Sequence, residues 1–245
     1  MHVNGLSAWA RVGPVWQAAI EEAWSAYGVG TVPVGAVLVD PQGAIVARGR
    51  NRIWDAGAAG QIGGSRLAHA EVNALLGLVG SSVDARTLAI YTTAEPCPLC
   101  VGAIVMANVR EIHYAAREPF AGSIAILAAT PYLRSKEIAA HGPRDRDLEG
   151  ALKAIGIEFH LRANGPRVGE LVARSAEIRP DAVALARWLI RSGRATSLRR
   201  MTAREGIAEL VRRLNSTTDS DRGAIYPELP EESQQAIRTG RNAHR

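Results

Sequence analysis

The segment 87–116 constrains the fold more than any other part of the chain. It reads as a strand (TLAIYTT), a helix (PLCVGAIVMAN) and a second strand (EIHYAA), joined by short connections. Two strands connected through a helix in this way lie parallel, because the chain must cross back over the sheet before the second strand can begin. The sequence therefore predicts an α/β fold that contains a βαβ unit.

The residues before this unit predict two helices and a hairpin. Apolar residues recur at helical spacing over 13–28, where a proline lies near the start and Gly28 lies at the end. Two short β-like runs, 32–40 and 44–51, are joined by the turn sequence PQG and form a predicted hairpin. The segment 68–80 has the composition of a helix that ends at a glycine.

The residues after the unit predict two helices and a last strand, followed by a change in composition. We expect helices over 130–140 and 146–156 and a strand over 157–162. Residues 1–162 hold 14 Lys and Arg against 14 Asp and Glu, whereas 163–245 hold 15 Arg, no Lys and 10 acids, so the net charge of +5 lies entirely in the second part. This asymmetry predicts one domain followed by a helical, Arg-rich C-terminal extension.

The extension contains two stretches with the apolar pattern of packed helices, RPDAVALARWLIRSG and TAREGIAELVRRLN. Its arginines alternate with acidic residues, which is typical of a solvated face with salt bridges. We therefore expect the extension to serve packing or dimerisation, and we expect a homodimer. RNA binding by the extension is the alternative, because Arg-rich segments also bind phosphate backbones.

Several classes of protein are disfavoured by what the chain lacks. No apolar run approaches the roughly 20 residues of a membrane helix, and the first residues do not resemble a signal peptide. Two cysteines are too few for a disulfide framework. We expect a cytoplasmic protein with no membrane partner, whose cysteines act as thiols or thiolates.

The two cysteines, Cys97 and Cys100, lie at the start of the helix of the βαβ unit. One helical turn separates them, so both sulfurs face the positive end of the helix, which favours thiolates. This placement suits a redox pair and a metal site equally well. A Cys₂His₂ zinc finger would use His113 as its third ligand, but residues 117–119 contain no second histidine.

A histidine and a glutamate lie at the start of another predicted helix, in the sequence HAE. His69 can join Cys97 and Cys100 as a third zinc ligand, which leaves one position for water, as in catalytic zinc sites. Glu71 can take a proton from that water and return it to a leaving group. The pattern therefore favours one catalytic Zn²⁺ per chain.

The motifs HAE and PCPLC together resemble the zinc-dependent cytidine/deoxycytidylate deaminase superfamily, whose signature is H-x-E followed by P-C-x-x-C. The stretches VPVGAVLV, GRNR, HAEVNAL and YTTAEPCPLCVGAI occur in the order seen in its branch of guanine, cytosine, deoxycytidylate and bacterial tRNA adenosine deaminases. The resemblance covers about residues 10–162.

The resemblance implies a three-layer α/β/α fold with a mixed five-stranded sheet whose fourth and fifth strands are parallel. It implies hydrolytic deamination, in which water activated by zinc attacks an amino-bearing ring carbon and Glu71 transfers the protons. It also implies that Asn51 binds the base and that the backbone of Ala70 contacts a ring substituent.

Three functions agree with these features. The first is deamination of a free nucleobase, nucleoside or related heterocycle such as a triazine, with guanine and cytosine as the leading candidates. The second is tRNA adenosine deamination, and the third is a non-catalytic zinc protein, which would have no use for Glu71. The 17 residues between Asn51 and His69 are more than a typical tRNA adenosine deaminase has there, and Trp54 in this loop could stack on a base or simply pack on the surface.

Overall fold

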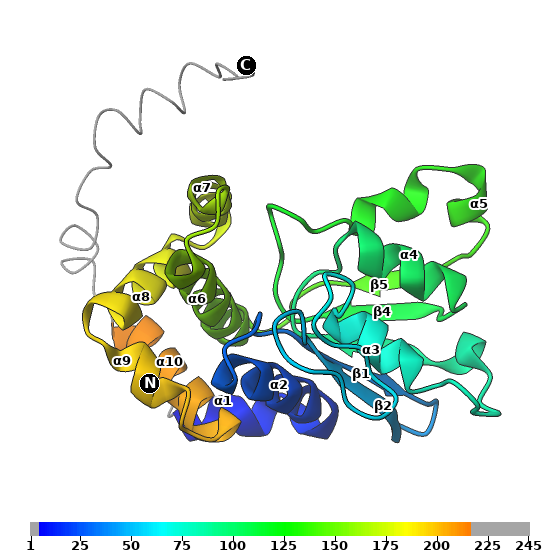
Figure 1. Ribbon diagram of the computed structural model, residues 1–245, viewed down its shortest axis with the longest axis horizontal. Coiled ribbons are helices and arrows are strands. Elements are labelled where there is room, and N and C mark those ends of the chain that lie inside the picture. The colour runs from blue at the N-terminus through cyan, green and yellow to red at the C-terminus, as the bar shows by residue number, and fades with distance from the viewer. Residues whose placement is uncertain (1–4, 217–245) are drawn as a thin grey trace, which may run out of the picture. The chain divides into compact units, whose positions relative to one another are not determined.

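A computed structural model describes residues 5–216 of the chain, with side chains from residue 8 onward. Its sheet has five strands in the order β2-β1-β3-β4-β5 (Figure 1). The strands are β1 (Gly35–Val39), β2 (Ile45–Arg50), β3 (Ala89–Thr92), β4 (Glu111–Tyr114) and β5 (Ala139–His141). β1 is antiparallel to β2 and β3, whereas β3, β4 and β5 are parallel. The expected mixed five-stranded sheet is confirmed.

Helices precede, connect and follow the strands. They are α1 (Gly5–Arg11), α2 (Gly13–Gly28), α3 (Ala70–Leu76), α4 (Pro98–Met106), α5 (Pro131–Arg134), α6 (Arg146–Ala163), α7 (Val168–Ile178), α8 (Pro180–Arg191), α9 (Arg194–Leu198) and α10 (Ala203–Ser216), with short 3-10 helices at Ala85–Thr87 and Ile124–Ala128. Within the described residues, no helix is long and apolar enough to cross a membrane.

The sheet lies between two layers of helices. Successive residues of β1 point to opposite faces, as the pleat of a strand requires. Val37 and Val39 pack with Ala18 and Ala19 of α2. On the other face, residues of β1, α3, α4 and β4 form one cluster, which includes Ala36, Leu38, Ala70, Ala74, Ile104 and Ile112. The three-layer α/β/α fold is therefore confirmed.

The last strand and the helix after it differ from the sequence prediction. The segment 157–162 is not a strand but the end of α6. The helix expected over 130–140 ends at Arg134, a turn follows it, and its last two residues are the beginning of β5. Leu152, Ile155 and Phe159 are all buried, so the helical spacing of apolar residues continues through the segment expected to be a strand. β5 is still parallel to β4, as the resemblance implied.

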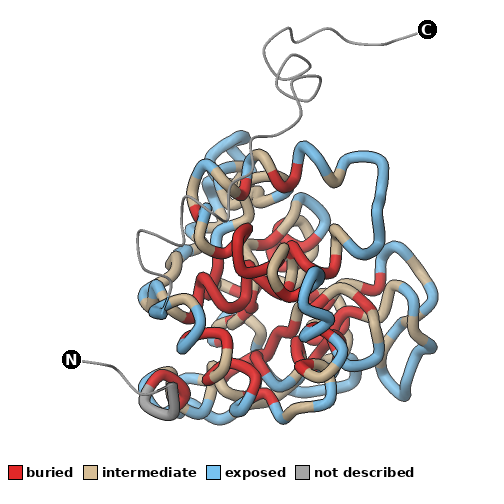
Figure 2. Tube along the Cα trace, turned by 90° about the vertical axis from the view of Figure 1, so that its left-hand side faces the viewer, coloured by how far each residue is buried: buried red, intermediate tan, exposed pale blue. Residues whose placement is uncertain are grey.

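The helices after α6 belong to the same compact unit as the sheet, which covers residues up to 214. α6 ends at Ala163, where Asn164 adopts a left-handed conformation with φ 48°. α8 packs against α6, and Ile207 and Leu210 of α10 join the same buried cluster as Trp24 of α2. Figure 2 shows that the buried residues are concentrated in the interior and that the exposed residues lie mostly on the outside. The described part of the extension therefore packs on the rest of the chain.

The boundary at residue 162 between a deaminase domain and the extension stays a prediction about how the sequence is organised. Residues 217–245, the remainder of the predicted extension, lie outside the described residues. A capping box precedes α10, because the backbone N–H of Thr202 donates to the Glu205 carboxylate and the backbone N–H of Glu205 donates to the Thr202 hydroxyl.

Gly35 marks the closest approach of α2 to the sheet. A Cβ atom at this position would overlap backbone atoms of Ala19 and Ala23. We expect Gly35→Ala to lower the free energy of unfolding by about 1–3 kcal/mol, because backbone cannot move aside as a flexible side chain can. Urea denaturation measures this, with Gly169→Ala on α7 as control, since Gly169 has open space around it. Equal stability of the two variants would contradict the close packing.

Candidate active site

The N-termini of α3 and α4 meet near the C-terminal end of β3 and hold the motif residues. His69 precedes α3 in an extended conformation, with φ −76° and ψ 156°. Cys97 precedes α4 in the same way, and Pro98 takes the first helical position, where its missing N–H costs no hydrogen bond. Cys100 then lies one turn into α4 and is buried. The three side chains converge although they come from two helices.

The three ligand atoms have the spacing that a tetrahedral zinc ion requires. The Nδ1 atom of His69 lies 3.5 Å from Sγ of Cys97 and 3.4 Å from Sγ of Cys100, and the two sulfurs are 3.6 Å apart. Zinc bonds of ordinary length at tetrahedral angles would place sulfur and nitrogen about 3.6 Å apart and the two sulfurs about 3.8 Å apart. The residues therefore fit one metal ion without rearrangement.

The protonation states of this group favour metal binding. Hydrogen bonding from Cys100, together with His69, lowers the pKa of Cys97 to about 4, so Cys97 is a thiolate at neutral pH. The same contact with the Cys97 sulfur, together with burial, raises the pKa of Cys100. A cation placed between the sulfurs would favour the thiolate of Cys100 as well, because it takes the place of the thiol proton through which Cys100 bonds to Cys97.

Glu71 lies beside the ligand group and is almost completely buried, with 3% of its surface exposed. Its Oε2 atom is 3.2 Å from the sulfur of Cys100, and its Oε1 atom accepts a hydrogen bond of 3.1 Å from the hydroxyl of Thr92. Burial raises the pKa of Glu71. A carboxyl group with a raised pKa can both accept and donate a proton near neutral pH.

A pocket of about 570 Å³ opens above this group. His69, Glu71 and Cys97 lie in its lining, together with Asn51. The opposite side is formed by α6 and by the loop between α6 and α7. The lining residues from these two segments are Leu152, Lys153, Gly156, Ile157, His160, Gly165, Pro166 and Arg167. Two of the three metal ligands, His69 and Cys97, therefore line a cavity, and the third, Cys100, is buried next to them.

Asn51 presents a hydrogen-bond donor to the pocket. Its Oδ1 atom accepts hydrogen bonds from the backbone N–H of Ile53, at 3.1 Å, and from the hydroxyl of Thr31, at 2.8 Å. The backbone N–H can only donate, so it fixes which end of the amide is oxygen. The NH₂ group of Asn51 is therefore the end available to a ligand.

Ala70 lies next to the ligand group, but its side chain belongs to the hydrophobic core on the α3 side of the sheet. It is fully buried and is not among the residues that line the pocket. The contact of its backbone with a substrate stays a prediction.

The loop between Asn51 and His69 is held in place by polar contacts. The side chain of Asn73 on α3 bonds to both backbone groups of Ile62, and Arg52 contacts Asp55 at 2.8 Å. Trp54 stacks on Phe159 of α6 at a ring distance of 5.3 Å and remains 63% exposed. Trp54 thus packs on the surface beside the pocket instead of lining it.

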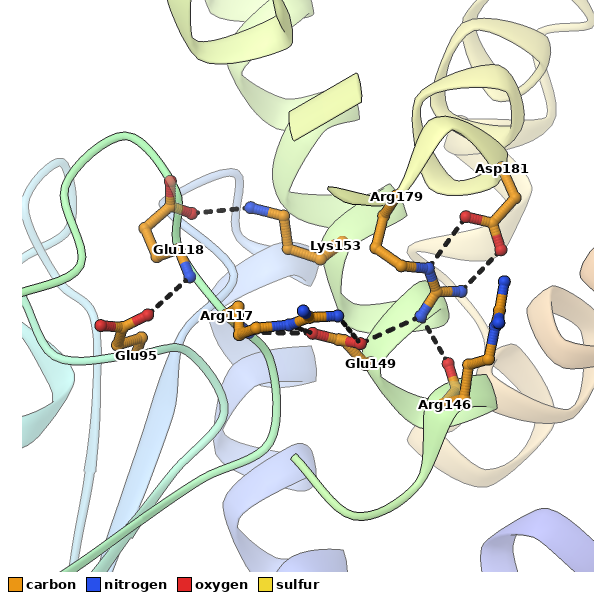
Figure 3. A network of polar contacts seen from close by, with 8 residues as sticks. All are labelled: Glu95, Arg117, Glu118, Arg146, Glu149, Lys153, Arg179 and Asp181. Carbon is orange, nitrogen blue, oxygen red and sulfur yellow. Dashed lines mark hydrogen bonds and ion pairs between the residues drawn. The ribbon is translucent and has the colours of Figure 1, made fainter. Parts of the chain in front are cut away.

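The wall of the pocket carries charged residues that the sequence motifs did not indicate. Glu118, in the loop after β4, pairs with the buried Lys153 of α6 at 2.9 Å, and its backbone N–H donates to Glu95, two residues before Cys97 (Figure 3). The neighbouring Arg117 pairs with Glu149 of α6 at 2.7 Å. This network joins the segment before the metal ligands to α6.

The same network continues into the extension. Arg179 is 3% exposed and lies 3.3 Å from Glu149 and 2.7 Å from Asp181 (Figure 3). It also donates to the backbone carbonyl of Arg146 at the start of α6. The N-terminus of α8 is therefore joined to the pocket wall through Glu149 and Arg117.

Comparison with known proteins identifies related sequences. The family model described as the cytidine and deoxycytidylate deaminase zinc-binding region matches residues 14–116. The tRNA-specific adenosine deaminase of Bacillus subtilis is 37% identical over 157 residues, which cover 61% of this chain and 91% of that protein. The guanine deaminase of Bacillus subtilis is 37% identical over 86 residues, or 34% of this chain and half of that protein.

A third relative is much longer than the region of similarity. The tRNA(Ile)-lysidine synthase of Deinococcus radiodurans is 39% identical over 97 residues, which are 38% of this chain but only 15% of that protein.

The matched family model describes a zinc-binding region, and the His69, Cys97 and Cys100 group can hold one metal ion. The zinc cofactor expected from the sequence is thereby confirmed.

Proposed function

The chain belongs to the zinc-dependent cytidine/deoxycytidylate deaminase superfamily, and on that premise we propose that its pocket removes an amino group hydrolytically from a small nucleobase, nucleoside or related heterocycle. The observation that carries the proposal is the buried Glu71 carboxyl group beside three potential zinc ligands, two of which, His69 and Cys97, line the same pocket as Glu71. A structural zinc site would need neither the buried acid nor the cavity.

The residues of the site divide the chemistry among them. His69, Cys97 and Cys100 would hold the zinc ion, which supplies the Lewis acidity that makes water a nucleophile at neutral pH. Glu71 accepts a proton from this water and delivers protons to the ring nitrogen and to the departing amine. The balanced reaction converts the C–NH₂ group and one water into a carbonyl group and ammonia.

Two neighbours prepare the site for this reaction. Thr92 donates to Oε1 of Glu71, which orients the carboxyl group toward Cys100. Asn51 offers its NH₂ group to an acceptor on the substrate, such as a ring nitrogen or a carbonyl oxygen. A substrate that carries an acceptor on the edge facing Asn51 is therefore favoured.

The enclosure of the pocket supports a small substrate. A volume of about 570 Å³ lies within the range of sites that surround small molecules. α6 and the loop that follows it cover the side opposite the zinc ligands, where a polynucleotide would need open space. Guanine and cytosine remain the leading candidates, and a triazine remains possible in the same chemical class.

Deamination of adenosine in tRNA is the second candidate. The observation in its favour is the 37% identity to the tRNA-specific adenosine deaminase of Bacillus subtilis over nearly the whole length of that protein. The Arg-rich extension could provide phosphate contacts, although the described part of it packs on α6 and α2. A homodimer and a cytoplasmic location also stay predictions.

Ammonia release by the zinc-loaded protein separates these candidates. The panel comprises bases, nucleosides, nucleotides, aminotriazines and tRNA at matched concentrations. We expect release from at least one free heterocycle. Release from tRNA alone would replace the first candidate with the second, and the absence of release from every substrate would contradict deamination.

Substitutions at Asn51 test the donor assigned to it. Asn51→Asp keeps an oxygen for the N–H of Ile53 but replaces the NH₂ donor with a second oxygen. We expect kcat/KM to fall by about 10–100-fold. The hydrogen bond from the NH₂ group to the substrate is lost, and the new carboxylate oxygen repels the acceptor atom of the substrate. Steady-state kinetics on the best substrate measures this. If Asn51→Asp retains full kcat/KM, the NH₂ group does not bind the substrate.

A further inference from the structure

A second group of metal-binding side chains lies on the two parallel strands farthest from the hairpin. Glu111 and His113 are two residues apart on β4, so they point to the same face of the sheet. His141 on β5 is the direct neighbour of His113 in the strand register. Two histidines and one carboxylate therefore come together on a rigid backbone, away from the residues that line the pocket.

The distances within this group approach those of a metal site. The Oε1 atom of Glu111 lies 2.8 Å from Nε2 of His113 and 3.3 Å from Nε2 of His141. Zinc bonds of ordinary length at tetrahedral angles would place such ligand atoms about 3.3 Å apart. One ligand atom from each of the three residues lies within 4.8 Å of the others. The rings of His113 and His141 stack at a centroid distance of 4.6 Å, so the remaining adjustment is a rotation of the His141 ring about χ2, which is a soft torsion.

The surroundings keep the group accessible and ready to bind. The side chains of His113, His141 and Glu111 are 14%, 37% and 45% exposed, so an ion can reach them from solvent. Tyr91 stacks on the other face of the His113 ring at 4.3 Å, which limits how that ring can turn.

We propose that Glu111, His113 and His141 form a second metal site, which binds a divalent transition-metal ion such as Zn²⁺ and is separate from the site in the pocket. Imidazole and carboxylate ligands suit Zn²⁺, Co²⁺ and Ni²⁺, and they differ from the thiolates of the pocket site. A bound ion would link β4 to β5, the edge strand of only three residues. The site would thus stabilise the strand that precedes α6.

Cobalt binding distinguishes the two sites, because only thiolate ligands give a sulfur-to-cobalt charge-transfer band. We expect the metal-free wild-type protein to bind about two Co²⁺ per chain, where one equivalent shows the charge-transfer band and the other shows only visible ligand-field absorption. Equilibrium dialysis with metal analysis provides the stoichiometry, and titration spectra assign each equivalent.

Variants locate the second equivalent. His141→Ala and Glu111→Gln should each bind about one Co²⁺, with the charge-transfer band intact, and that band also reports that the chain is folded. Glu137→Gln, an exposed acid between α5 and β5, should still bind about two. Binding of only one equivalent by the wild type, or of two by His141→Ala, would overturn the proposal. Neither result depends on the proposed deaminase activity, because no substrate is used.

Discussion

Replacement of Glu71 by glutamine is expected to lower kcat by about 10²–10⁴-fold, which is the usual contribution of a positioned acid–base group. Glutamine keeps the size of the side chain and can still accept from Thr92, but it cannot take up and release a proton. The zinc ligands are unchanged, so the zinc content per chain should equal that of the wild-type protein. Ammonia release and metal analysis on the same preparation measure both quantities.

Thr92→Val provides a graded comparison for this result. Valine fills the same buried space but removes the hydroxyl that orients Glu71. Thr92 is a positioning residue, so we expect a smaller loss in kcat, about tenfold, together with a shift of the acidic limb of the pH profile that the glutamine variant cannot show. If the Glu71→Gln variant holds zinc and keeps the wild-type kcat, Glu71 is not the group that transfers protons in the reaction.

Replacement of Arg179 by methionine is expected to lower the free energy of unfolding by about 3–5 kcal/mol, the usual cost of breaking a buried ion pair from one side. Arg179 and the side chain of Glu149 are only 3% and 4% exposed. Methionine fills part of the space but supplies none of the hydrogen bonds to Glu149, Asp181 and the carbonyl of Arg146. Chemical denaturation followed by circular dichroism measures the change.

Arg174→Met on α7 is the matched control, because Arg174 forms an exposed pair with Glu177 at 3.9 Å. We expect a change of less than about 0.5 kcal/mol there. If Arg179→Met is as stable as Arg174→Met, the extension does not depend on this network to hold α8 against α6.

The effect of Arg179→Met should also depend on pH. Burial would raise the pKa of Glu149, but hydrogen bonds from Arg117 and the nearby charges hold it below its ordinary value of 4.5. Stability from a carboxylate with a lowered pKa is fully present above pH 4.5 and is lost as the pH falls through the folded-state value. The difference in the free energy of unfolding between the wild-type protein and Arg179→Met should therefore become smaller as the pH falls below 4.5.

Strong local patterns made much of the fold predictable. The helix over 13–28, the hairpin after it and the strand–helix–strand unit around Cys97 each combine an apolar period with a turn or cap signal. β5 has neither signal, because its three residues, Ala139–His141, are largely exposed. The sequence therefore predicts the last strand at 157–162 instead, where the apolar residues in fact continue the buried face of α6.

The site was predictable only where it is local in sequence. HAE and PCPLC each lie at one helix start, so their spacing indicates a shared target before the fold is known. One wall of the pocket is formed by α6, a helix that begins more than 40 residues after Cys100. No sequence motif indicates that this helix packs beside the metal ligands. Lys153 and Glu118 also pair across 35 positions of sequence, so neither predicts the other.

The source of the oxygen in the product tests the central claim most directly. Zinc-loaded wild-type protein is incubated in H₂¹⁸O with the best substrate from the panel, and the product is analysed by mass spectrometry while ammonia is measured in parallel. Hydrolytic deamination predicts one ¹⁸O atom in the product for each ammonia released, and neither product from the Glu71→Gln variant within the same time. Ammonia release without ¹⁸O incorporation, or equal turnover by the protein stripped of zinc, would contradict the proposed reaction.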